Sequence, residues 1–136
     1  MITAVDTCVL LDVFTADPTF GPASRDCLGE CLAVGSVLAC AVVWAETSAC
    51  FPEPESTEAA MATLRATFSA LEKRSADHAG EAWRSYRQDG GPRQRVVADF
   101  LIGAHASLQA DRLLTRDRGF YRSYFPDLTV VDPTAG

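Results

Sequence analysis

Short apolar runs alternate along this chain with longer stretches in which apolar residues recur every three or four positions. The apolar runs predict strands at Ile2–Val5, Ser36–Ala41, Arg112–Thr115 and Leu128–Val131. The periodic stretches predict helices at Ala23–Val34, Val42–Phe51, Glu58–Lys73, Ala76–Arg87 and Arg95–Ala110, with Cys8–Phe14 leading into the first turn of another. Strands that alternate with helices form parallel βαβ units. The pattern therefore predicts a three-layer α/β/α fold around an open, mainly parallel sheet.

Turn-forming residues separate these elements without dividing the chain into domains. Pro and Gly interrupt the pattern at 17–22, 52–55 and 89–92, and Ser56 or Thr57 is the expected N-cap of the helix that follows. The chain has 136 residues, 48% hydrophobic and 22% charged, as expected for one globular domain over 1–136. No apolar run approaches the roughly 20 residues that span a bilayer. Asp6 and Asp12 stand where a signal peptide is basic, so we expect a cytoplasmic protein that binds no membrane.

Cysteine usage and charge narrow the class of protein further. Five cysteines without a CxxC pair argue against a disulfide framework or a zinc site. The net charge is −6, yet residues 61–124 hold eleven bases against seven acids. Eleven of the twelve bases in the chain are Arg, whose planar guanidinium suits phosphate. The overall acidity argues against tight sequence-independent binding of nucleic acid, but it permits one local basic face.

Four acids lie beside apolar stretches instead of within charged runs: Asp6, Glu46, Asp99 and Asp117. Asp6 and Asp117 follow predicted strands, at the sheet edge where ligands bind, and the other two lie on helices that can lean over that edge. Four converging carboxylates repel one another unless they share a cation such as Mg²⁺ or Mn²⁺. A metal held mainly by carboxylates is typical of phosphodiester chemistry. The alternative is that each acid is a helix cap or a surface charge.

Three segments of the sequence place an acid next to an apolar strand or helix. In Val5–Leu11 an acid at a strand end is followed by Thr; Ala98–Ala106 is an apolar helix with an acid near its start; and in Leu113–Phe120 a Thr precedes the acid by two positions. Together the segments resemble the PIN domain of VapC-type ribonuclease toxins in order and spacing. Glu46, early in a helix after a strand, fits the second acid of that family. The resemblance covers essentially the whole chain.

The resemblance implies a metal-dependent endoribonuclease that cleaves single-stranded RNA, as the toxin of a type II toxin–antitoxin system. It implies a VapB-type antitoxin that blocks the site, a homodimer, and one or two Mg²⁺ (or Mn²⁺) ions held by the four catalytic acids. In this sequence, Cys8 replaces the small polar residue that many relatives have two places after the first acid. Gly119 replaces the further acid that some relatives have after the fourth, which leaves the number of ions open.

Other residues near the acids are candidates for positioning the substrate. Thr7 and Thr115 would orient a water, a phosphate oxygen or a carboxylate, or would bond only the local backbone. Arg116 is the leading candidate among the bases that would steer the RNA backbone: Arg93, Arg95, Arg112, Arg116, Arg118 and Arg122. The aromatic segment 120–125 either stacks RNA bases or, as we favour, packs in the core or at a dimer interface. His105, about 120° around the helix from Asp99, is interpreted as structural.

Two other functions compete with this interpretation. A haloacid-dehalogenase-like phosphatase also uses Mg²⁺ and acids at strand ends, but it needs a second Asp two residues after the first, where this chain has Cys8. A catalytically inactive PIN-like module that binds RNA or protein would normally lack one of the acids, and none is missing here. The ribonuclease therefore remains the favoured hypothesis.

Overall fold

Five parallel strands form one sheet in the part of the chain that the computed structural model describes, residues 1–91 and 95–135. The strands are β1 (Ile2–Val5), β2 (Ser36–Cys40), β3 (Ala66–Ser69), β4 (Arg112–Leu114) and β5 (Val130–Val131). They are arranged in the order β3-β2-β1-β4-β5, and every neighbouring pair is parallel. The predicted open, parallel sheet is confirmed, with one strand more than expected.

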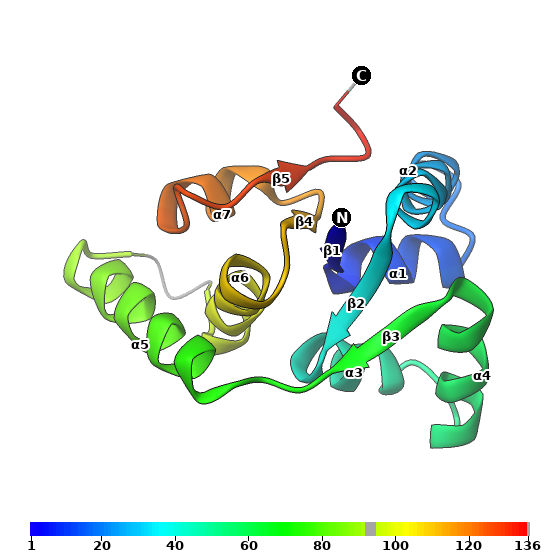
Figure 1. Ribbon diagram of the computed structural model, residues 1–136, viewed down its shortest axis with the longest axis horizontal. Helices are drawn as coiled ribbons and strands as arrows, with labels where there is room; N and C mark the ends of the chain where they lie inside the picture. The colour runs from blue at the N-terminus through cyan, green and yellow to red at the C-terminus, as the bar shows by residue number, and fades with distance from the viewer. Residues whose placement is uncertain (92–94, 136) are drawn as a thin grey trace.

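Helices connect successive strands and cover both faces of the sheet. They are α1 (Thr7–Phe14), α2 (Gly21–Val34), α3 (Ala41–Ser48), α4 (Pro54–Leu64), α5 (Lys73–Gln88), α6 (Val97–Gln109) and α7 (Arg118–Tyr124). In Figure 1, α1, α2 and α4 lie to the right of the central strands, α3 lies at their lower end, and α5 to α7 lie to the left. Right-handed crossovers explain this division, because the chain adds β2 and β3 on one side of β1 and then returns to add β4 and β5 on the other. The predicted three-layer α/β/α architecture is confirmed.

An aromatic cluster fixes the helices on the second face. The ring of Phe100 in α6 lies 5.4 Å from that of Tyr86 in α5 and 5.1 Å from that of Phe120 in α7, measured between centroids. Gly103 lacks a side chain, and the Phe125 ring occupies the space that a Cβ would fill. Phe120, Tyr121 and Phe125 are buried and Tyr124 packs against them, so the aromatic side chains of the segment 120–125 lie in the core, as we favoured.

The order of the strands places the switch point of the sheet beside β1. The chain moves in one direction from β1 to β3 and in the other direction from β4 to β5, so the strand order reverses between β1 and β4. Val5 pairs with Leu114 at the carboxyl end of these two strands, and the amide of Asp6 donates to the Leu114 carbonyl over 2.9 Å. Parallel α/β sheets bind ligands at such a reversal. The residues that follow β1 and β4 therefore face the expected binding edge.

The predicted helix Glu58–Lys73 is wrong in its second half. Helix α4 begins earlier, with Pro54 in its first turn and Glu53 as N-cap, so the cap expected at Ser56 or Thr57 is also wrong. It ends at Leu64, because Arg65 adopts a left-handed conformation with φ of 59°. The next four residues form β3, an edge strand paired with β2. Helix α7 was not predicted at all.

Candidate active site

Asp6 is a carboxylate that the fold buries at the end of β1. It is the N-cap of α1, and its residue is only 9% exposed. One oxygen, Oδ1, accepts from the Thr7 amide over 2.8 Å; the other, Oδ2, accepts from the hydroxyls of Thr115 over 2.7 Å and Tyr121 over 3.3 Å. Burial raises the pKa of Asp6; the hydrogen bonds oppose this shift, and the nearby charge of Glu46 adds to it. The protein thus holds this carboxylate in one orientation.

Two threonines connect the candidate acids to one another. The buried hydroxyl of Thr115 donates to Asp6 and accepts from the amide of Asp117 over 3.0 Å. The hydroxyl of Thr7 donates to Oε1 of Glu46 over 2.7 Å. The sequence left several roles open for these two threonines. In the structure, both hydroxyls donate to carboxylates.

Asp99 and Asp117 each lie at the start of a helix and each has a partner. Asp99, in the first turn of α6, accepts from the Val96 amide over 3.3 Å, so this acid also serves as a helix cap. Both oxygens of Asp117 accept from Arg95, over 2.5 Å from Nη1 and 3.2 Å from Nη2. The Arg95 guanidinium also lies 4.2 Å from the centre of the Phe120 ring.

The charges of the candidate acids act on Tyr121 and Asp6. The pKa of the Tyr121 hydroxyl is raised first by burial and then by the charges of Asp6, Asp99 and Asp117. Glu46 acts in the same way on Asp6. Within residues 1–91 and 95–135, however, no three His, Cys, Asp or Glu side chains are arranged to hold a metal ion. The four acids therefore lie in one region of the fold, but no three of them are close enough together to form a preformed metal site.

The donor chemistry of this region fits a hard divalent cation. Carboxylate oxygens are the ligands that Mg²⁺ and Mn²⁺ prefer. Among the described residues, Arg95 is the one base that forms an ion pair with any of the four acids, so an excess of negative charge remains when all four are ionised. A divalent ion would compensate that excess.

Arg116 lies against a buried acid that sequence reasoning missed. Its guanidinium donates to both oxygens of Asp12, over 2.8 and 3.0 Å, and lies 4.0 Å from the centre of the Phe20 ring. Asp12, whose side chain is 5% exposed, also accepts from the Ser24 hydroxyl over 2.7 Å. These contacts tie the loop before α7 to α1 and α2. They give Arg116 a structural role, and its expected role with substrate stays a prediction.

The remaining candidate bases are placed less centrally. Arg112 donates to the hydroxyl of Thr3 over 2.9 Å, and Arg118 lies 3.6 Å from the carboxylate of Asp132. Arg93 lies outside the described residues. Sequence reasoning also missed Tyr121 as a partner of Asp6, although an aromatic segment that begins three residues after Asp117 offered a weak signal.

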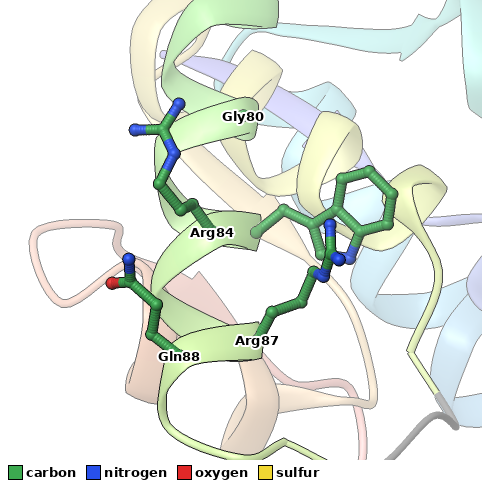
Figure 2. A pocket seen from close by; sticks show the side chains of 5 residues that line it. Gly80, Arg84, Arg87 and Gln88 are labelled. Carbon is green, nitrogen blue, oxygen red and sulfur yellow. The ribbon is translucent and has the colours of Figure 1, made fainter.

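Cavity shape does not identify the acids. A surface cavity of about 540 Å³ lies along α5 and is lined by Gly80, Trp83, Arg84, Arg87 and Gln88. Figure 2 shows Arg84 and Gln88 projecting from one flank of this helix, while the Arg87 guanidinium lies 5.5 Å from the centre of the Trp83 ring. None of the four acids lines this cavity. The candidate site therefore rests on topology, hydrogen bonds and charge.

Comparison with known proteins identifies the fold family. The family model of the PIN domain matches residues 3–126. The chain belongs to the PIN-domain family. No curated protein sequence matches this chain. Solved structures similar to this PIN domain include VapBC2 from Rickettsia felis bound to a promoter DNA fragment (18% identity, 97% of this chain and 98% of that chain, TM-score 0.75). VapBC-1 from nontypeable Haemophilus influenzae is also similar (20% identity, 98% and 99%, TM-score 0.72).

A third structure shares the PIN fold at a greater distance. VapC20 of Mycobacterium tuberculosis, a toxin that cleaves the sarcin–ricin loop, is 16% identical over 82% of this chain and 86% of that chain, with a TM-score of 0.53. At these identities the structures establish the fold of this PIN domain and leave its chemistry to the residues described above.

Proposed function

We propose that this PIN domain is a metal-dependent endoribonuclease that cleaves single-stranded RNA and acts as the toxin of a type II toxin–antitoxin system. One observation carries the proposal: Asp6 is buried and fixed at the switch point of the sheet, where Thr115 links it to the amide of Asp117 and the charge of Glu46 acts on it. Ionisable groups with such perturbed environments cluster at functional sites. The structural similarity to VapC proteins adds support.

The residues would divide the chemistry among them. The proposed catalytic residues and ligands of Mg²⁺ or Mn²⁺ are the four acids Asp6, Glu46, Asp99 and Asp117. When bound, such an ion supplies a Lewis acid that lowers the pKa of a bound water and stabilises charge on the scissile phosphate. Thr115 and Tyr121 orient Asp6, and Thr7 orients Glu46, so each carboxylate is positioned before the substrate arrives.

Cleavage of single-stranded RNA by the purified chain tests the proposal. We expect cleavage that requires Mg²⁺ or Mn²⁺ and stops on addition of EDTA. Asp6→Asn and Asp99→Asn should each lower the rate by at least about a hundredfold while the circular dichroism spectrum stays that of the wild type. Asp127→Asn, at an exposed acid outside the candidate set, is the matched control and should cleave at the wild-type rate. Near-wild-type activity of Asp6→Asn would disprove the site assignment.

The proposed partners are a VapB-type antitoxin, an RNA substrate and a second copy of the chain. The antitoxin is supported by the neighbours that were solved as VapBC complexes. Co-expression with the adjacent gene should yield a stable complex without ribonuclease activity, and size-exclusion chromatography of the toxin alone should show a dimer. None of the helices in the described part of the chain has the length and apolar character needed to cross a membrane. We propose the cytoplasm as the site of action because the antitoxin and the RNA would be found there.

An inactive binding module is the second candidate, and one observation favours it. The described residues hold no preformed group of three metal-binding side chains. This alternative predicts binding of single-stranded RNA without cleavage in either Mg²⁺ or Mn²⁺. The same assay therefore separates the two functions.

A further inference from the structure

Arg95 forms the closest ionic contact in the candidate site. It precedes α6, and its two terminal nitrogens reach the two oxygens of Asp117 in a planar, bidentate pair. The guanidinium lies over the face of the Phe120 ring, and the negative charge of Asp99 also stabilises it. The Arg95 side chain is 29% exposed and that of Asp117 is 39% exposed, so solvent and ligands reach the pair.

This pair conflicts with the proposed use of Asp117 as a metal ligand. Both carboxylate oxygens already accept a hydrogen bond from Arg95, and a divalent cation beside them would repel the guanidinium. A cation that binds Asp117 must therefore either share the two oxygens with the guanidinium or displace Arg95. Displacement of Arg95 should cost little free energy, because the pair is partly exposed and exposed ion pairs contribute little to stability.

A second Arg–Asp pair in the chain shows what a permanent pair looks like. Arg116 also donates two hydrogen bonds to its Asp, from Nε and Nη2, and also lies over an aromatic ring, but the Asp12 carboxylate is buried and accepts from Ser24 as well. The Asp117 carboxylate has no comparable burial, and it lies beside other acids. The Arg95–Asp117 pair is therefore the exchangeable one.

We propose that Arg95 is an internal counter-cation of Asp117, which a divalent cation displaces, and that the released guanidinium then binds a phosphate of the RNA. The inference rests on the proposed function, because it assigns Asp117 to the metal. A guanidinium fork matches phosphate as well as it matches carboxylate. The face of Phe120 keeps the released side chain close to the acids, where the scissile phosphate would lie.

Calorimetric titration of the metal-free protein with Mn²⁺ tests the exchange without relying on activity. Arg95→Gln removes the competing charge, so Mn²⁺ should bind about fivefold more tightly than to the wild type. Arg25→Gln, at an exposed Arg that pairs with Asp26 on α2, is the matched control and should bind Mn²⁺ as the wild type does. Arg95→Gln should nevertheless have a lower kcat/KM for RNA, because the phosphate contact is lost. The slope of log(kcat/KM) against the logarithm of the salt concentration should become less steep by about one.

Each outcome has a separate meaning. If the wild type binds no Mn²⁺, the proposed function fails. If Mn²⁺ binds equally well to the wild type and to Arg95→Gln, the exchange is disproved while the proposed function stands. Tighter Mn²⁺ binding with unchanged kcat/KM and salt dependence disproves the phosphate contact. If Arg95→Gln does not fold, ¹⁵N NMR of arginine side chains decides: in the wild type the Arg95 Nε–H signal must shift as Mg²⁺ is added, and a stationary signal overturns the exchange.

Discussion

Thr115 uses one hydroxyl to hold two segments of the candidate site together. Its hydrogen goes to Asp6, which follows β1, and its oxygen accepts from the amide of Asp117, which follows β4. The side chain is completely buried, so water cannot replace either bond. The loss of this hydroxyl would leave a buried carboxylate oxygen and a backbone amide without their partner.

Replacement of Thr115 by Val keeps the shape of the side chain and removes the hydroxyl. We expect Thr115→Val to lower the free energy of unfolding by about 1–3 kcal/mol, because partners in a buried site lose a hydrogen bond. Cleavage should fall at least about tenfold because Asp6 is no longer oriented. Urea denaturation and initial rates measure the two effects. Thr115→Ser, which retains the hydroxyl, should stay close to the wild type; equal losses in both variants would contradict the role assigned to the hydroxyl.

Arg116 is predicted to matter more for stability than for substrate binding. Arg116→Ala leaves the buried Asp12 carboxylate without its cation, which should lower the free energy of unfolding by about 3 kcal/mol. Arg122→Ala, at an exposed Arg of α7, is the control and should change it by less than about 0.5 kcal/mol. Denaturant titration compares the two. A stable Arg116→Ala variant with a raised KM for RNA would restore the role that the sequence suggested.

The sequence located the candidate acids but not the residues that they contact. Asp6 and Asp117 were recognisable because each follows an apolar strand, and a strand end is a local property of the chain. Their partners come from far away: Thr115 is 109 positions from Asp6, and Arg95 is 22 positions from Asp117. No local pattern specifies such pairs. For the same reason Asp12, an acid within an apolar run, was not recognised as the partner of Arg116.

At the scale of elements, β3 shows where periodicity alone misleads. Apolar residues continue at helical spacing beyond Leu64, and the strand that replaces the helix has only four residues. Thr67 and Phe68 are exposed, so the alternation of buried and exposed positions that marks a strand is absent. Pairing with β2 decides the conformation, and that pairing is a tertiary interaction. The longer elements, whose burial follows their own periodicity, were predicted within a few residues.

The contact between α6 and β3 should make stability depend on pH. His105 is completely buried, its Nε2 lies 2.9 Å from the Ser69 hydroxyl, and burial lowers its pKa. The unfolded chain therefore takes up a proton below about pH 6.5, where the folded protein still resists it. The free energy of unfolding should fall as the pH falls from that value through the lowered pKa. Urea denaturation between pH 7.5 and 5 measures the slope, which His105→Gln should reduce; an unchanged slope would exclude His105 as its source.

At the scale of the whole molecule, the reversal of strand order assembles the site. The fold class followed from the sequence because alternating strands and helices leave few topologies open. The contacts of the acids could not be predicted from the sequence, since they depend on side-chain partners as much as on strand order. Because the fold brings the acids together, binding of the proposed cation would be linked to the stability of the folded domain.

Mn²⁺ should stabilise the folded protein, because it would bind the clustered carboxylates only when they are brought together. At a free concentration about 100 times the dissociation constant, the gain in the free energy of unfolding is about 2.7 kcal/mol. Thermal unfolding with and without Mn²⁺ measures it as a rise in Tm. Asp6→Asn should show a much smaller rise. Equal shifts in the two proteins would place the metal elsewhere.

The position of β1 at the centre of the sheet also determines when the site can exist during synthesis. β1 emerges from the ribosome before α1 to α6 and well before β4, although the two strands are neighbours in the sheet and Thr3 lies opposite Arg112. Until then Asp6 has neither the Thr115 hydroxyl nor the Tyr121 hydroxyl. A nascent chain on the ribosome therefore cannot complete the proposed nuclease centre until β4 and α7 have been synthesised.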